Sequence, residues 1–155
     1  MRIAIVGAGI AGLVRYPEGI FVWGPHVPGA NIPVRSILEA EFGVPAAVDN
    51  DANTAALAEL HSGAAVGRSD ALLGSRGTGI GGAVIADGDV YRGSSFAGEW
   101  GHMIYQANGL QCDCGKRGCW ETVASGPALA RLGREGVDEG PHEGPGADAI
   151  RGRGR

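Results

Sequence analysis

Glycine is the residue type that most constrains how this chain can fold. The 155 residues include 29 glycines, whereas average usage of about 7% predicts about 11. The glycines have no three-residue period, which excludes a collagen-like triple helix. The chain is 44% hydrophobic, so it has enough apolar side chains to bury a core. We therefore expect glycine to mark turns and close backbone approaches within a folded domain.

The first group of glycines, in VGAGIAG, has the G-x-G-x-x-G spacing of a dinucleotide-binding turn. That fingerprint requires a helix that starts inside the motif, and Pro17 and Gly19 follow too soon to allow one. We therefore expect a strand at residues 2–6 that ends in a glycine-rich turn. The other two groups lie between Gly74 and Gly118 and in the last twenty residues.

Periodicity and capping residues predict alternating helices and strands, which indicates an α/β fold with a mixed sheet. Helices are expected at 33–42 with Gly43 as the stop, from Asn50 or Asp51 to about Ala65, and from Trp120 to about Arg134 with an interruption at Gly126-Pro127. Strands are expected at 20–23, 46–48, 70–74, 80–86 and 89–91, with a two-residue hairpin turn at Asp87-Gly88.

Four residues of the types that bind metal ions lie between positions 102 and 119. The spacing H-x9-C-x-C-x4-C is formed by His102, Cys112, Cys114 and Cys119. The odd cysteine count and the strain of a Cys112–Cys114 bridge disfavour a disulfide framework. Thiolates and an imidazole are ligands that Zn²⁺ prefers, and four of them close a tetrahedral structural site. The sequence therefore predicts a zinc knuckle; the alternative is three free or buried thiols beside an unrelated histidine.

The remaining composition argues against two classes of partner. No apolar run reaches 18 residues, and the run at residues 3–6 is too short for the core of a signal peptide, so we expect neither a membrane span nor a leader. The net charge is −4, and no basic patch is large enough to predict DNA binding. We expect a cytoplasmic protein.

Three segments together resemble the ROK family, whose name stands for repressor, open reading frame and kinase. They are GTGIGGAVIADGDVYRGSSFAGEWGHM, CDCGKRGCWETVASGPAL and VDNDANTAALAEL. VGAGIAGLV also resembles the strand and turn that lead into the family's sugar site, which replaces the dinucleotide interpretation. The resemblance covers about residues 3–135 and is greatest to the glucokinases and related hexose kinases. It implies part of an actin-like, ribonuclease-H-like sugar kinase fold with a mixed sheet and a zinc knuckle.

The resemblance implies a role for each matched residue. Asp51 matches the general base, which would accept a proton from a hexose hydroxyl. The matched sugar-binding residues are Asn50, Glu99, His102 and Glu121. The second phosphate loop matches Gly77, Thr78, Gly79, Gly81 and Gly82. The ligands of the structural zinc match His102, Cys112, Cys114 and Cys119. Without the resemblance, Asp51 would be interpreted as a helix N-cap and the glycine loop as a turn.

The implied activity is ATP-dependent phosphorylation of a hexose, with glucose the first choice and Mg²⁺ on the nucleotide. Residues 1–135 match the central part of a family chain, without the N-terminal D-x-G-x-T loop or the C-terminal adenosine-binding segment, so we interpret the chain as truncated at both ends. Residues 136–155 predict a disordered tail. The alternatives are an inactive zinc-stabilised remnant and a sugar-sensing repressor, which would need an upstream helix-turn-helix. The sequence leaves open whether the chain forms a homo-oligomer.

Overall fold

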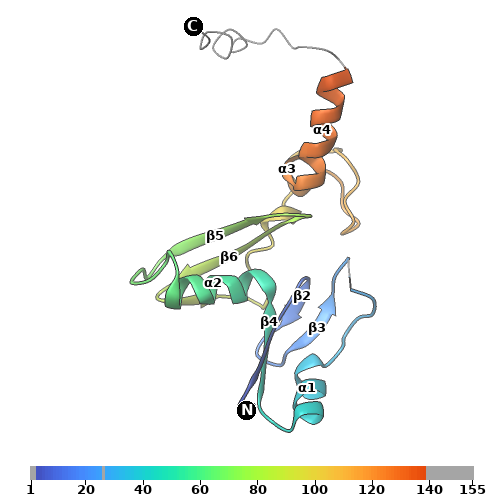
Figure 1. Cartoon of the computed structure of the whole chain (residues 1–155). Helices are drawn as coiled ribbons and strands as arrows, with labels where there is room; N and C mark the ends of the chain where they lie inside the picture. The colour runs from blue at the N-terminus through green and yellow to red at the C-terminus, as the bar shows by residue number, and fades with distance from the viewer. Residues whose placement is uncertain (1–2, 26, 139–155) are drawn as a thin grey trace, which may run out of the picture.

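The computed structural model describes residues 3–25 and 27–138, in which parallel and antiparallel strand pairs form three small sheets (Figure 1). The strands are β1 (Val6–Ile10), β2 (Leu13–Arg15), β3 (Ile20–Trp23), β4 (Ala46–Asn50), β5 (Ala71–Arg76), β6 (Ile80–Ala86) and β7 (Asp89–Tyr91). The helices are α1 (Val34–Phe42), α2 (Asp51–Ser62), α3 (Glu121–Ala124), α4 (Gly126–Asp138) and the short 3-10 helix η1 (Trp100–His102). β1 pairs in parallel with β4, β2 pairs with β3, and β5, β6 and β7 form an antiparallel sheet.

β1 begins four residues later than the sequence predicts, because pairing with β4 decides its limits. The expected strand at 2–6 is therefore wrong, and so is the expected turn at Gly7 and Gly9, since both glycines lie inside the strand. Gly12, with a φ of 132°, makes the turn instead. Gly9 faces the start of α2, where a Cβ atom would lie 3.1 Å from Thr54 Oγ1. Gly9 therefore allows α2 to approach β1 closely.

β1 leads into a second strand and not into a helix, which agrees with the rejection of a dinucleotide fingerprint. That strand, β2, was not predicted from the sequence. It pairs with β3, and Val14 lies opposite Phe21 with both side chains almost fully buried. Three residues are too few for an alternating pattern to be recognised, so only the partner strand reveals β2.

α1 and α2 begin close to their predicted positions because local capping determines where they start and stop. Gly43 ends α1 in the left-handed conformation, with a φ of 63°. Asn50 is the N-cap of α2, and its side chain accepts hydrogen bonds from the N–H groups of Ala52 and Asn53. α2 ends at Ser62, three residues before the predicted end.

The three-stranded sheet packs against α2 around a core of small and branched side chains, which include Ala56, Ala83, Ile85 and Val90. The turn between β6 and β7 has positive φ at both central residues, 53° at Asp87 and 81° at Gly88. This is the conformation that a two-residue hairpin turn requires, so the predicted hairpin is confirmed. α2 therefore touches both β1 and the β5–β7 sheet and joins the two ends of the fold (Figure 1).

The predicted C-terminal helix is divided at Ser125, one residue before the expected interruption. Pro127 lies in the first turn of α4, where its missing N–H has no intrahelical partner to lose. Figure 1 shows α4 projecting away from the sheets. It includes residues 136–138 of the predicted tail, and residues 139–155 lie outside the described part of the chain. Within residues 3–25 and 27–138, no helix is long and apolar enough to cross a bilayer.

Candidate active site

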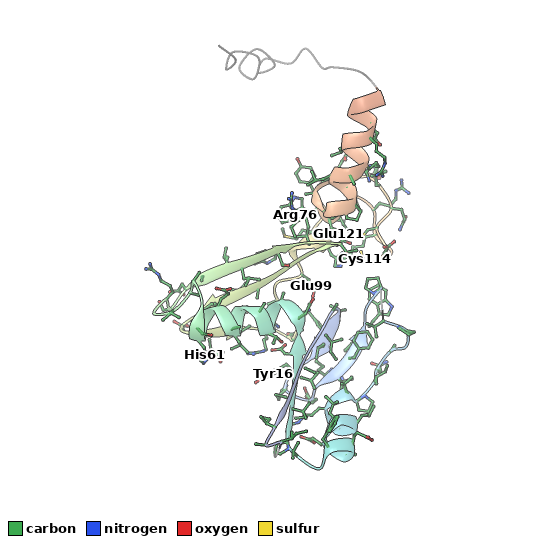
Figure 2. The ribbon with its side chains drawn as sticks, viewed as in Figure 1. Tyr16, His61, Arg76, Glu99, Cys114 and Glu121 are labelled. Atoms are coloured by element: carbon green, nitrogen blue, oxygen red, sulfur yellow. The ribbon has the colours of Figure 1, made fainter. Side chains whose placement is uncertain are left out.

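One open cleft of about 760 Å³ gathers the residues that the resemblance assigned to sugar and phosphate binding. They come from the β4–α2 corner, from the loop between β5 and β6 and the first residues of β6, and from the segment after β7. The cleft is lined by Asn50, Asp51, Gly77, Thr78, Gly79, Gly81, Gly82, Glu99, His102 and Glu121, among others. Figure 2 shows Glu99 and Glu121 near the ends of β5 and β6. The fold therefore brings together residues that lie far apart in the sequence.

The β4–α2 corner carries Asn50 and Asp51. Asn50 Oδ1 accepts hydrogen bonds from Ala52 N at 2.8 Å and from Asn53 N at 3.1 Å, and Asn50 Nδ2 donates to the Gly12 carbonyl at 3.0 Å. One amide hydrogen of Asn50 is left for a ligand. Asn50 and not Asp51 is the N-cap, although Asp51 Oδ1 also accepts from Ala52 N at 3.0 Å. The Asp51 carboxylate is exposed at the first position of the helix.

The loop between β5 and β6 is a tight glycine turn in which Gly77 N donates to Gly79 O at 3.0 Å. A Cβ atom on Gly79 would lie 2.8 Å from Glu121 Oε2, and one on Gly82 would lie 2.6 Å from the Trp100 ring. Glycine is therefore needed at Gly82, where the Trp100 ring occupies the space, whereas at Gly79 a side chain would require only the end of Glu121 to move. Among the described residues, no group accepts a hydrogen bond from the N–H of Thr78 or Gly79. These donors remain available to an anion in the cleft.

The cleft is acidic. Asp51, Glu99 and Glu121 all line it. Burial raises the pKa of Glu99; the nearby His102 lowers it, and the charges of Asp51 and Glu121 raise it further. A neutral ligand with many hydroxyl groups can donate to these carboxylates without adding charge to the cleft.

His102, Cys112, Cys114 and Cys119 converge at the edge of the cleft, and their ligand atoms all lie within 4.8 Å of one another. Cys114 Sγ is 3.6 Å from Cys119 Sγ, and Cys112 Sγ is 3.7 Å from His102 Nδ1. Ligands about 2.3 Å from a tetrahedral metal ion would be about 3.8 Å apart. The three cysteines form no disulfide. The cluster could therefore hold a metal ion, as the spacing predicted.

Glu121 connects this cluster to the glycine loop. Its Oε1 accepts from Cys112 Sγ at 3.1 Å and lies 3.5 Å from His102 Nδ1, while its Oε2 accepts from Ile80 N at 3.4 Å. Burial raises the pKa of the Cys112 thiol, and the hydrogen bond to Glu121 raises it further. The sequence indicated a sugar-binding role for Glu121, and the structure adds a contact with the metal-ligand cluster.

Three residues of the site region were missed from the sequence. Arg131 is the one Arg or Lys among the described residues that line the cleft, and its guanidinium donates to the Thr122 carbonyl at 3.0 Å. Asp49 and Arg92 form an ion pair behind the β4–α2 corner. Asp49 and Arg92 lie in segments that resemble the family, but no sequence pattern pairs them, and no motif marks Arg131, so only the fold shows these contacts.

A helix-start carboxylate, a glycine loop and a Cys/His cluster surround one cleft in an α/β fold, and solved ROK sugar kinases and a solved ROK transcriptional regulator share this fold. The chain belongs to the ROK family, which it matches over residues 1–148. The resemblance seen in the sequence is thereby confirmed.

Relatives within the family include both enzymes and regulators. The chain is 40% identical over 136 residues to a glucokinase of Halalkalibacterium halodurans, and 40% identical over 130 residues to the xylose repressor of Bacillus spizizenii. These alignments cover 86% and 82% of this chain but 41% and 34% of the relatives. The crystal structure of a ROK family glucokinase from Streptomyces griseus with glucose and AMPPNP has a TM-score of 0.82 and 36% identity, covering 90% of this chain and 45% of that chain. The chain therefore spans less than half the length of each of these relatives.

Proposed function

We propose that this chain carries the hexose site and one phosphate-binding loop of an ATP-dependent sugar kinase, with glucose as the preferred substrate. The observation that carries the proposal is the shared cleft, which Asp51, Glu99 and Glu121 line together with the glycine loop. The similarity to glucokinases, one of them solved with glucose and AMPPNP, supports it. Hexose and ATP are both found in the cytoplasm, so the proposal includes a cytoplasmic location.

In the proposed mechanism, Asn50, Glu99, His102 and Glu121 hold the sugar by its hydroxyl groups, and Asp51 acts as the general base. The proton of one hydroxyl passes to the Asp51 carboxylate as the sugar oxygen bonds to the γ-phosphorus, and ADP leaves. Such a positioned base contributes about 10²–10⁴ in rate. Asp51 suits this role because its carboxylate is exposed on a corner that Asn50 holds in place.

The glycine loop would bind the phosphates of the nucleotide. The N–H groups of Thr78 and Gly79 are available donors, and Arg131 is the nearby cation on the cleft wall. A triphosphate entering an acidic cleft needs positive charge to balance it, which Arg131 and a nucleotide-bound Mg²⁺ together would supply.

We also propose that the Cys/His cluster binds zinc and that the zinc is structural. Three thiolates and one imidazole fill the four positions of a tetrahedral zinc and leave none open for substrate. The metal would hold residues 102–119 in place and so position Glu121. His102 Nδ1 faces the cluster, which leaves Nε2 for a sugar hydroxyl.

A coupled assay of ADP release tests the kinase, with glucose, mannose, fructose and N-acetylmannosamine as substrates. Binding of each sugar to the 155-residue chain is measured in parallel through Trp100 and Trp120 fluorescence. We expect glucose to bind, and turnover to fall in Asp51→Asn while binding remains. Equal turnover in Asp51→Asn would refute the role of the base.

The second candidate is a sugar-sensing repressor, which the 40% identity to a xylose repressor favours. A repressor would bind sugar through the same cleft but would not need a nucleotide. Sugar binding that is independent of ATP, with no ADP release for any hexose and a preference for a pentose such as xylose, would favour this candidate over the kinase.

A further inference from the structure

We propose that Arg92 is a positioning residue, which holds the β4–α2 corner of the cleft through a buried ion pair with Asp49. The corner carries Asn50 and Asp51, so the consequences for sugar binding rest on the proposed function. The contacts of Arg92 do not depend on the proposed function, and they can be tested without a ligand.

The ion pair is short and well buried. Arg92 Nε lies 2.8 Å from Asp49 Oδ2, and the two side chains are only 13% and 9% exposed. Asp49 uses its other oxygen for the corner, because Oδ1 accepts from Asn50 N at 2.8 Å and from Asn53 Nδ2 at 3.1 Å. The carboxylate therefore joins Arg92 to the first residues of the corner.

Arg92 also ties the corner to the loop that leads to Glu99. Its guanidinium donates to the Val90 carbonyl at 2.9 Å and stacks on the Tyr16 ring, 3.9 Å from the centroid. Ser95 Oγ, three residues further along that loop, accepts from Tyr16 N and donates to Tyr16 O. Tyr16 and Glu99, at the two ends of this connection, are labelled in Figure 2. One side chain thus links β4, the β2–β3 turn and the loop before Glu99.

Removing one partner of a buried ion pair leaves an uncompensated charge, whereas replacing both by apolar side chains is often neutral for stability. In Arg92→Met, the buried Asp49 carboxylate would have to recruit water or turn away from the Asn50 N–H. The corner would loosen even if the rest of the chain stayed folded. A pair that only adds stability would instead be replaceable by two apolar side chains at no cost to the site.

The first test is hydrogen exchange on the 155-residue chain without ligand. In Arg92→Met we expect the amide of Asn50 to exchange about tenfold faster, as loss of a hydrogen bond to a charged acceptor implies, and the amides of β5 and β6 to be unchanged. Arg68→Met is the matched control, since Arg68 is exposed and does not line the cleft. An unchanged Asn50 amide in folded Arg92→Met would overturn the proposal.

The second test uses the double variant Asp49→Leu/Arg92→Met. We expect its thermal midpoint to recover toward wild type, while its glucose affinity remains about tenfold weaker because the Asn50 N–H and the Asn53 amide have lost their charged acceptor. Full recovery of both properties would show that the pair is only structural and would overturn the proposal.

If the double variant does not fold, Arg92→Lys replaces it: partial protection of the Asn50 amide supports the proposal, and protection no better than in Arg92→Met contradicts it. If the wild-type chain binds no sugar, the proposed function fails, but the exchange experiment still decides the role of Arg92.

Discussion

The two walls of the cleft are held in place by different means. The β4–α2 wall consists of regular secondary structure, with Asn50 as helix cap and the Asp49–Arg92 pair behind it. The opposite wall, residues 99–121, contains one three-residue 3-10 helix and isolated bridges. Met103 and Tyr105 on that wall are more than half exposed, while Cys112 and Cys119 are buried. The first wall is held by the hydrogen bonds of a strand and a helix, whereas the second combines the backbone hydrogen bonds of its turns with the meeting of four side chains.

This difference matters because the proposed site needs both walls. Asp51 stands on the first, and Glu99, His102 and Glu121 stand on the second. A segment with few buried apolar groups cannot offset its own conformational entropy without another source of stability. Metal binding supplies free energy of this kind, and a metal ion would therefore act on half of the site selectively.

The largest expected effect is from Cys119→Ser, which removes a fully buried thiol of the Cys/His cluster, one of the proposed zinc ligands. Structural zinc contributes about 10–16 kcal/mol of apparent free energy in small zinc domains, so we expect loss of bound metal and of amide protection across residues 99–121. The β4–α2 wall should keep its protection. Metal content by mass spectrometry and hydrogen exchange check both. Asp113→Asn, at an exposed position between the ligands, is the control.

Two results would contradict this comparison of the walls. One is a wild-type chain that contains no metal and yet protects residues 99–121 fully. The other is a Cys119→Ser variant that keeps one metal ion per chain.

Next in size is Asp51→Asn, for which we expect turnover to fall by about 10²–10⁴ if the carboxylate is the base. The sugar affinity and the fold should hardly change, because Asn50 caps the helix and the substituted amide keeps the shape of the carboxylate. Steady-state assays with a fluorescence titration separate the two quantities. Asp70→Asn, which lies before β5 and does not line the cleft, should retain wild-type turnover.

A smaller effect is expected from Gly82→Ala, which tests how closely the wall at residues 99–121 approaches β6. The new methyl group would lie 2.6 Å from the Trp100 ring, so the ring must move, and overpacking of this kind costs about 1–3 kcal/mol. Gly81→Ala is the matched control, because its methyl group would meet Ala52 Cβ at an ordinary 3.7 Å. Urea unfolding followed by tryptophan fluorescence measures both variants. An equal loss of unfolding free energy in the two variants would show that the Trp100 contact is not the cause.

The smallest effect is expected from Glu99→Gln, which should change how the Tm depends on pH. The folded state raises the pKa of Glu99 above the ordinary 4.5, so it favours the protonated form. The stability from this group is present below 4.5 and is lost as the pH rises through the folded pKa. Glutamine does not ionise, and the variant should therefore gain in Tm relative to wild type as the pH rises above 4.5. The gain is limited because Glu99 is only partly buried. A constant Tm difference would contradict the assignment.

Predictions from the sequence were correct for structural features that depend on a few neighbouring residues. Gly43 ends α1 and Asp87-Gly88 makes the hairpin turn because both depend on local backbone conformation. The H-x9-C-x-C-x4-C spacing likewise indicated four ligands that the structure brings within 4.8 Å of one another. These predictions required no knowledge of distant partners.

The sequence by itself therefore determined the family, the capping and turn positions, and which residues are candidates for the site. Only the tertiary structure decided the limits of β1, which depend on β4, and the existence of β2, which depends on β3. It also decided that Asp49 and Arg92, 43 residues apart, form a buried pair. The physical reason is that a strand edge or a buried charge is satisfied by a partner that the fold brings to it, and such a partner leaves no local pattern.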